Sequence, residues 1–309
     1  MQQGILCIGA AHVDRKAKAK TAVQLGTSIP VLVEQGLGGV ARNVAENLAR
    51  MGCQVAIASR LGHDKEAEWV HKHSLDLGID VSGLVYSKHH PTASYTALLD
   101  DRGELVLGLA NMEIYDEFTA DTLTDLPASL FTRPIWFLDT NLPQETLRQL
   151  LQKRTPNHLI AVDPVSTPKA RKLLGLLEGI DFLFPNRDEA EVLSGIKIST
   201  LDDVRRAGEA ICAQGVGHVI ITLGSEGVYV VGGGIERVFP AFAADVCDVT
   251  GAGDALIAGF LCGYQQTESV ESAITHGLAA AKLTIETTET VNPLLTPERL
   301  QLILHSSNI

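Results

Sequence analysis

Short runs of apolar residues recur along the chain, and segments with helical periodicity separate them. The runs are followed by polar residues, as is typical of strands buried on both faces of a parallel sheet. The β-α-β-α order predicts an α/β fold in three layers, with a central, mostly parallel sheet between helices. The predicted strands span residues 5–10, 55–59, 135–139, 159–163, 182–184 and 218–223, and the predicted helices include 41–51, 144–152, 188–193 and 201–213.

Two regions interrupt this alternation and have the pattern of β structure instead. They span residues 15–36 and 92–110, and the second has two apolar runs on either side of Arg102 and Gly103, which predicts a hairpin. No proline- or serine-rich linker sets either region apart. We therefore expect residues 1–309 to form a single domain, in which these two regions make a small β lid over a cleft.

The composition suits a large folded protein with no general attraction to polyanions. Of the 309 residues, 45% are hydrophobic and 20% are charged, which is enough apolar material for one large core. The formal net charge of -12 argues against partners such as nucleic acid or an anionic membrane surface. The one basic run, at residues 15–20, fits either a solvated face or an element that steers phosphate groups.

The sequence also bears on location. No run approaches the roughly 20 apolar residues that a membrane-spanning helix needs, and the first residues lack the layout of a signal peptide. The five cysteines are scattered without a CxxC pair, which is typical of a reducing compartment. We therefore expect a cytoplasmic protein.

The strongest candidate for chemistry is Gly251-Ala252-Gly253-Asp254, at the start of an apolar helix. The glycines allow a tight turn in which successive N–H groups and the positive end of the helix dipole point at one place, which suits a phosphoryl group. Asp254 would then lie beside this anion site, where it could take a proton from an attacking hydroxyl. On these residues alone, Asp254 could equally be a helix cap.

This helix resembles the second signature of the PfkB, or ribokinase-like, family of carbohydrate and nucleoside kinases, with Asp248, Thr250, Gly251, Gly253 and Asp254 matching. The resemblance implies a kinase domain with a ribokinase-like fold that transfers phosphate from ATP to an alcohol group. It implies that Asp254 is the catalytic base and that residues 251–253 form the anion hole. It also implies a monovalent cation, K⁺, held near Asp248 and Thr250.

The first PfkB signature is matched by Gly38-Gly39-Val40-Ala41-Arg42-Asn43-Val44-Ala45. By resemblance, Gly39 and Asn43 contact the acceptor, and Asp14 accepts hydrogen bonds from vicinal sugar hydroxyls. As an isolated feature, the Gly38-Gly39 pair could be an ordinary turn into a helix.

Two motifs on the nucleotide side follow in the family's order. Asn186 and Glu189 resemble the NxxE motif, and Thr222, Gly224 and Gly227 resemble the TxGxxG loop. By resemblance, Asn186 and this loop bind the nucleotide, while Asn186 and Glu189 organise Mg²⁺ through water. Amide and carboxylate oxygens suit such a hard, hydrated cation. Asn186 could also be only a helix cap.

Within the family, the chain resembles the pseudouridine kinase branch. The Gly38–Asn43 stretch matches the GGVxRN of that branch, and residues 92–100 match its T-S-Y strand. This implies phosphorylation of the 5′-hydroxyl of a nucleoside, with pseudouridine as the expected acceptor. His12, Ile29 and Asn111 depart from the branch pattern, which expects asparagine, asparagine and aspartate there. The expected acceptor contacts are His12, Asp14, Ser28, Gly39, Asn43, Thr92, Ser94 and Asn111.

Several alternatives stay open at this point. A ribokinase, a fructokinase or another nucleoside kinase would share these motifs. A non-catalytic sugar- or nucleoside-binding protein on the same fold is disfavoured by the intact Asp254. A dinucleotide-binding dehydrogenase is disfavoured because Gly9-Ala10-Ala11-His12 is not a GxGxxG fingerprint. Lid-to-lid dimers in the family imply a homodimer.

Overall fold

The computed structural model describes residues 4–306 and is built around a nine-stranded sheet. The strands lie in the order β13-β12-β11-β10-β9-β8-β1-β4-β5, and all from β11 to β5 run parallel. At one edge, β12 pairs antiparallel with β11, and β13 pairs antiparallel with β12, so the sheet is mixed there. The strands are β1 Ile5–Ile8, β4 Val55–Leu61, β5 Asp80–Tyr86, β8 Ile135–Asp139, β9 Leu159–Asp163, β10 Phe182–Leu183, β11 His218–Thr222, β12 Val228–Gly232 and β13 Ile235–Phe239.

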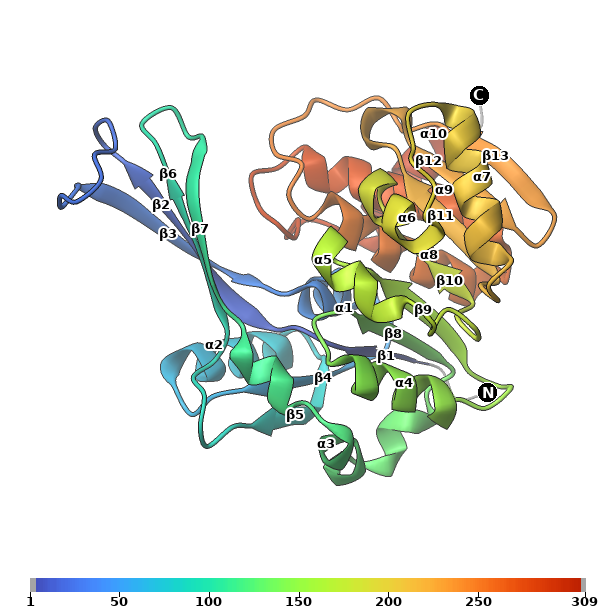
Figure 1. The fold of residues 1–309 in the computed structure, drawn as a ribbon, viewed down its shortest axis with the longest axis horizontal. Coiled ribbons are helices and arrows are strands. Elements are labelled where there is room, and N and C mark those ends of the chain that lie inside the picture. The colour runs from blue at the N-terminus through green and yellow to red at the C-terminus, as the bar shows by residue number, and fades with distance from the viewer. Residues whose placement is uncertain (1–3, 307–309) are drawn as a thin grey trace.

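Helices cover both faces of this sheet (Figure 1). Successive strand residues point to opposite faces, so Ile5 and Cys7 pack into one core while Leu6 and Ile8 pack into the other. The first core is closed by α1 Val40–Arg50, α2 Lys65–Asp76, α8 Ala252–Thr267, α9 Val270–Ile285 and α10 Pro297–Ser306. The second is closed by α3 Ala120–Asp125, α4 Gln144–Lys153, α5 Thr167–Ala170, α6 Arg187–Ser194 and α7 Leu201–Cys212. Short 3₁₀ turns lie at Glu113–Glu117, Ala128–Thr132, Arg171–Leu173 and Gly224–Glu226.

A second sheet of four strands projects from the body (Figure 1). Its order is β3-β2-β6-β7, from β2 His12–Ala19, β3 Val31–Gly38, β6 Ser94–Leu99 and β7 Leu105–Asn111. The two hairpins β2–β3 and β6–β7 are antiparallel, and β2 pairs with β6 in parallel. The two regions that interrupt the α/β alternation therefore meet in one sheet, although residues 39–93 separate them in the sequence.

The predicted three-layer α/β architecture is confirmed. The strands at Ile135–Asp139 and Leu159–Asp163 have the predicted bounds, and the other predicted elements shift by a few residues at their ends. The sequence interpretation missed the antiparallel edge made by β12 and β13. No helix within residues 4–306 is long and apolar enough to cross a lipid bilayer.

Candidate active site

Helix α8 begins with the glycine-rich turn. Gly251 has a φ of 80°, and a Cβ atom there would lie 1.9 Å from the carbonyl oxygen of Thr290, so only glycine fits. The turn leads directly into the first turn of the helix, which contains Gly253 and Asp254. The first N–H groups of a helix lack intrahelical partners and, with the helix dipole, attract an anion. The N-terminus of a helix, where anions are favoured, and a carboxylate thus lie side by side.

The carboxyl group of Asp254 is set to titrate near neutral pH. Burial raises its pKa to about 7, and the charges of Asp139 and Asp14 act in the same direction. A hydrogen bond from Asn43 Nδ2 to Asp254 Oδ2, at 2.6 Å, and the positive charge of Arg42 oppose this rise. A carboxyl group with such a pKa can take up a proton and release it again at neutral pH.

Asp14 and Gly39 lie where the second sheet joins the body. Gly39 precedes helix α1 with a φ of 99°, and a Cβ atom there would lie 2.4 Å from the carbonyl oxygen of Ala10. Only glycine therefore allows the two backbone segments to lie this close together. Asp14 Oδ1 lies 3.2 Å from Nε2 of His12. Both side chains are on β2 and line the same cleft as Asn43 and Asp254.

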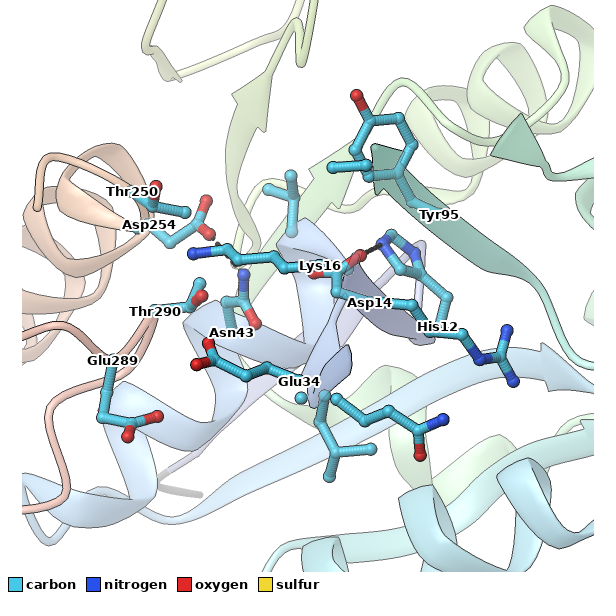
Figure 2. Close-up of a pocket in the computed structure, with 18 of the residues that line it drawn as sticks. His12, Asp14, Lys16, Glu34, Asn43, Tyr95, Thr250, Asp254, Glu289 and Thr290 are labelled. Carbon is cyan, nitrogen blue, oxygen red and sulfur yellow. Dashed lines mark hydrogen bonds and ion pairs between the residues drawn. The ribbon is translucent and has the colours of Figure 1, made fainter. Parts of the chain in front are cut away.

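This cleft lies between the second sheet and the body and has a volume of about 1190 Å³ (Figure 2). Figure 2 shows the Lys16 side chain reaching from β2 toward Thr250 and Asp254. Its Nζ atom lies 3.5 Å from Asp248 Oδ2, so the basic side chain joins the small sheet to the loop before α8. The cleft therefore contains a carboxyl group with a near-neutral pKa, the N-terminus of helix α8 and, from the small sheet, the side chain of a lysine.

A second lysine, Lys169, lies on the body side of the cleft. Its Nζ donates to Asn141 Oδ1 at 2.6 Å. Burial lowers the pKa of Lys169, although the negative charges of Asp139 and Asp163 oppose this change. The lysine lies just beyond the carboxyl end of β9, where parallel α/β sheets place their binding sites.

A smaller cavity of about 150 Å³ is lined by the motif residues Asn186, Glu189 and Thr222 together with Asp163 and Gly253. Asn186 and Glu189 form a capping box on α6, in which each side chain accepts a hydrogen bond from the other residue's backbone N–H at 2.9 Å. Burial raises the pKa of Glu189, and burial together with neighbouring carboxylates raises that of Asp163. The cavity is thus rich in carboxyl oxygens and adjoins the glycine turn of α8.

Comparison with known proteins decides the family. The model of the pfkB family of carbohydrate kinases matches residues 2–297. The chain belongs to this family.

Relatives of known name agree with the assignment. The chain is 31% identical over 289 residues to a pseudouridine kinase of Escherichia coli strain K12, covering 92% of this chain and 91% of the relative. A carbohydrate kinase from Agrobacterium tumefaciens superposes with a TM-score of 0.86 at 30% identity, covering 98% and 97% of the two chains. An Arabidopsis thaliana ribokinase complexed with ribose and ATP has the same fold, with a TM-score of 0.87 at 21% identity and coverage of 98% and 99%.

The PfkB motif residues in the body converge, but four of the expected acceptor contacts do not line the cleft. Ser28 is exposed in the loop between β2 and β3. The Thr92 side chain donates to Asp64 Oδ1 at 2.6 Å, so it belongs to the N-terminal cap of α2. Ser94 and Asn111 face each other across the start of β6 and the end of β7, and their neighbours Tyr95 and Met112 line the cleft instead.

The proposed cation residues Asp248 and Thr250 are already bonded to each other. Asp248 Oδ1 accepts hydrogen bonds from the backbone N–H of Thr250 at 2.9 Å and from its hydroxyl at 2.7 Å. Burial would raise the pKa of Asp248, but these bonds and the charge of Lys16 lower it. The carboxylate is therefore ionised and lies next to the anion-binding turn.

Sequence reasoning missed the two lysines as parts of the cleft. Lys16 belongs to the basic run, for which the alternatives were a solvated face or phosphate steering, and the strand β2 turns this side chain toward Asp248. Lys169 follows the polar end of β9, a position that could have singled it out.

Proposed function

We propose that this PfkB family kinase transfers the γ-phosphate of ATP to the 5′-hydroxyl of a nucleoside, with pseudouridine as the acceptor. Family membership already makes the chain a kinase that acts on an alcohol group. The observation that carries the proposal is the position of Asp254, a half-buried carboxyl group with a pKa of about 7 at the N-terminus of α8 and open to the large cleft.

In the proposed reaction, Asp254 removes the proton from the acceptor hydroxyl. The hydroxyl oxygen attacks the γ-phosphorus, the bond to the β,γ-bridging oxygen breaks, and ADP leaves with that electron pair. The backbone turn of Gly251, Ala252 and Gly253 is assigned to stabilise the charge on the transferring group, mainly through Gly251 and Gly253, because the N–H of Ala252 donates to the carbonyl oxygen of Val249 at 3.2 Å. Asp14, Gly39 and Asn43, which line the same cleft, hold the acceptor ribose.

The nucleotide is assigned to the side of Asn186, Thr222, Gly224 and Gly227. An Arabidopsis ribokinase with this fold has been crystallised with ATP, which supports ATP as the donor. Gly224 and Gly227 have φ values of 64° and 97°, which allow the tight turn after β11.

Mg²⁺ fits the acidic cavity beside this loop. Within residues 4–306, no three or more His, Cys, Asp or Glu side chains are grouped to hold a metal ion by themselves. Glu189 and Asn186, with Asp163 nearby, would hold the ion together with water, and a bound cation would relieve the repulsion that raises the pKa of Asp163. When bound, Mg²⁺ neutralises phosphate charge. We place K⁺ next to Asp248 and Thr250, where a fixed cation would order the turn that receives the phosphate.

Two observations support pseudouridine. The chain shares the Gly38–Asn43 motif with the pseudouridine kinase branch and is 31% identical to the Escherichia coli enzyme over most of both chains. Pseudouridine differs from uridine by one additional ring N–H donor, so preference requires an acceptor in the cleft wall. His12 and Tyr95 line the cleft and each can accept such a bond, which makes them the candidates in place of Thr92 and Ser28.

The small sheet supports a homodimer. Leu105, Leu107 and Leu109 of the edge strand β7 are 50% to 60% exposed, as are Leu32 and Val33 of β3. Exposed apolar strands are typical of surfaces that pair with another chain. We propose that a second copy of the chain covers them.

An acceptor screen tests the proposed function. ATP-dependent phosphorylation is measured with pseudouridine, uridine, cytidine, adenosine, inosine, ribose and fructose, and pseudouridine and uridine are also mixed in one tube. We expect the highest kcat/KM with pseudouridine. Preference for uridine or a free sugar would change the assigned acceptor and leave the kinase activity in place. The absence of a phosphorylated product from all of these compounds would contradict the proposed reaction.

A further inference from the structure

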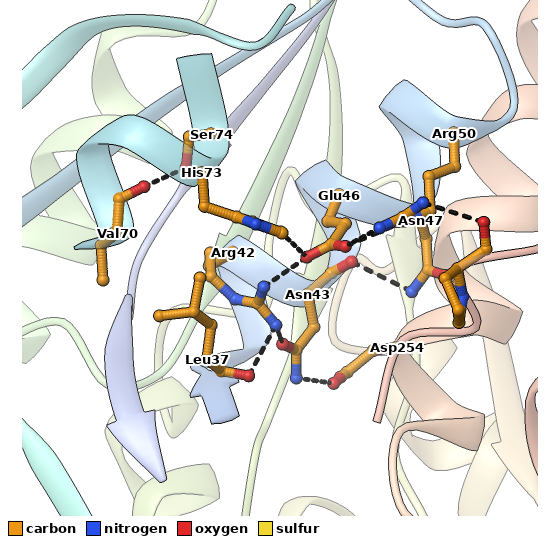
Figure 3. A network of polar contacts seen from close by, with 11 residues as sticks. Leu37, Arg42, Asn43, Glu46, Asn47, Arg50, Val70, His73, Ser74 and Asp254 are labelled. Carbon is orange, nitrogen blue, oxygen red and sulfur yellow. Dashed lines mark hydrogen bonds and ion pairs between the residues drawn. The ribbon is translucent and has the colours of Figure 1, made fainter. Parts of the chain in front are cut away.

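A chain of buried polar contacts runs from Asp254 into the interior of the body (Figure 3). It passes from Asp254 to Asn43, then to Arg42 and on to Glu46. The last three residues lie on helix α1 and are almost completely buried. None of the motif comparisons assigns a role to the arginine, which does not line the large cleft.

The guanidinium group of Arg42 makes three hydrogen bonds in different directions. Nη1 donates to Glu46 Oε2, and Nη2 donates both to Asn43 Oδ1 and, at 2.9 Å, to the carbonyl oxygen of Leu37. Leu37 lies at the end of β3, so the arginine connects the root of the small sheet with α1. Its planar, forked donor geometry makes this combination possible, and a lysine ammonium could not reproduce it.

Glu46 holds the arginine in place. It accepts hydrogen bonds from Nε and Nη2 of Arg50, at 2.9 and 2.7 Å, and its other oxygen lies 3.1 Å from Nε2 of His73. Burial would raise the pKa of Glu46, but the bonds from His73, Arg42 and Arg50 lower it to about 2. The carboxylate therefore stays ionised at every pH at which the enzyme is expected to work.

These contacts decide which way the Asn43 amide faces. An asparagine side chain has one acceptor oxygen and one donor NH₂ group. Because Arg42 can only donate, the oxygen must face Arg42 and the NH₂ group must face Asp254. A reversed amide would place two donors together at Arg42 and two acceptors together at Asp254, at a cost of roughly 1–3 kcal/mol for each unsatisfied buried group.

We propose that Arg42, held by Glu46, is a positioning residue for phosphoryl transfer: it fixes the Asn43 amide and keeps a positive charge behind Asp254. The inference rests on the proposed role of Asp254 as the base. In this arrangement, the Asn43 amide donates a hydrogen bond to the carboxyl group of Asp254. This bond keeps the carboxyl group aligned for the hydroxyl of the substrate.

Stabilisation of α1 alone explains the arrangement less well. A buried ion pair loses much of its Coulomb energy to desolvation, and apolar residues of similar size often replace one without loss of stability. If the ion pair between Arg42 and Glu46 served only to link two turns of one helix, Arg42 would need no contact with Asn43. The bond to the Asn43 oxygen, one residue away in sequence, is the part that points the amide at Asp254.

Other charged groups also act on Asp254 and must be separated from Arg42 in any test. Asp14 on β2, Asp139 at the end of β8 and Asp163 at the end of β9 favour its protonated form. Lys16 on β2 and Lys169 on α5 line the same cleft. Since all five remain in an Arg42 variant, a changed pH profile in that variant reports the loss of the guanidinium group.

Two substitutions separate the charge from the hydrogen-bond fork. Arg42→Gln removes the charge, and Arg42→Lys keeps the charge but loses the fork. Arg42→Lys also keeps a cation for Glu46, so it tests the role of the hydrogen-bond fork even where Arg42→Gln does not fold. Arg60→Gln is the control, because Arg60 makes a half-buried ion pair with Glu117 elsewhere in the body and does not line the cleft.

For Arg42→Lys we expect kcat to fall at least about tenfold with the KM for ATP nearly unchanged, because small errors in alignment are costly. For Arg42→Gln we expect, in addition, that the rise of kcat with pH moves to higher pH, since a nearby cation lowers the pKa of a carboxyl group. Arg60→Gln should keep the wild-type kcat and pH profile.

The inference is overturned if Arg42→Lys keeps kcat within about twofold of the wild type, because alignment errors of this kind cost far more. An unshifted profile in a folded Arg42→Gln would remove its electrostatic part. Asp254→Asn in the same assay tests the role of Asp254 as the base separately from the role of Arg42. If Asp254→Asn abolishes turnover and Arg42→Lys does not change it, the base assignment stands and only this inference fails.

Discussion

The α/β body and the four-stranded sheet use their strands in opposite ways. In the body, strand residues such as Trp136 and Phe137 are fully buried, because helices cover both faces of the sheet. In the small sheet, every residue of β7 is exposed, and no helix covers its outer face (Figure 1). The body therefore fixes groups such as Asp254 in a packed frame, whereas the small sheet presents side chains to the cleft on one side and to solvent on the other. On the proposed function, chemistry depends on the body, and acceptor binding and assembly depend on the small sheet.

The largest effect is expected in the body. Asp254→Asn removes the proposed base, so kcat should fall at least ~10²-fold, because a positioned general base contributes that much. ATP binding, measured by calorimetry, should stay close to that of the wild type. Asp202→Asn, in the exposed first turn of α7, is the matched control and should keep its turnover. Near-wild-type turnover of Asp254→Asn would remove the base from the mechanism.

At the root of the small sheet, Asp14→Ala should act on binding instead. Losing one partner of a buried polar contact costs ~1–3 kcal/mol, and more for a charged group, so the KM for the acceptor should rise roughly tenfold or more. The KM for ATP should change little. Asp101→Ala in the β6–β7 turn, which is exposed and outside the cleft, is the control. An increase in only the ATP constant would reverse our placement of the two substrates.

On the outer part of the small sheet, Leu107→Glu should separate subunits without harming the fold. Burial of a leucine contributes about 1.5–3 kcal/mol, and a symmetric dimer would contain this residue twice. Sedimentation should show the wild type as a dimer and the variant as a monomer. Leu302→Glu, at a more exposed position on α10, should leave the dimer intact. A wild-type protein that is monomeric at all concentrations would exclude this interface.

The smallest effect concerns the junction of the two regions, where Lys16 approaches Asp248. We expect K⁺ to stimulate turnover a few-fold, because a cation beside Asp248 and Thr250 would order the turn that starts α8. Rates are compared in K⁺ and in tetramethylammonium at equal ionic strength. Equal rates would indicate that Asp248 only caps the turn through its bonds to Thr250.

The same contrast explains how much could be predicted from sequence. Strands buried on both faces give continuous apolar runs, so β8 and β9 were predicted with their observed ends. Motifs that lie in one stretch of chain, such as Gly251–Asp254, placed the helix start and the carboxylate together. In contrast, most residues of β13 are exposed or partly buried, and the strand has no apolar run.

Contacts between distant segments were beyond the sequence. Thr92 was expected in the acceptor site, but Asp64, 28 residues earlier, binds its side chain as part of a helix cap. The basic run at residues 15–20 was ambiguous because its charged residues give no apolar pattern, although most of it belongs to strand β2. In this strand, Lys16 lines the cleft and Lys18 pairs with Leu32 on β3. The role inferred for Arg42 required the position of Glu46 and Asp254 around one amide, which no pattern in the sequence displays.

The pH dependence of kcat/KM for the acceptor, measured at saturating ATP, tests the central claim most directly. Burial gives Asp254 a pKa of about 7. A base with this pKa is protonated and inactive below it, so kcat/KM should rise with pH to a plateau, with a midpoint near 7. His12→Asn should keep this rise, which separates Asp254 from the imidazole that lines the same cleft. The residual activity of Asp254→Asn should be independent of pH in this range. A wild-type profile that is flat from about pH 5.5 to 8.5, or an Asp254→Asn profile with the same rise, would contradict the account.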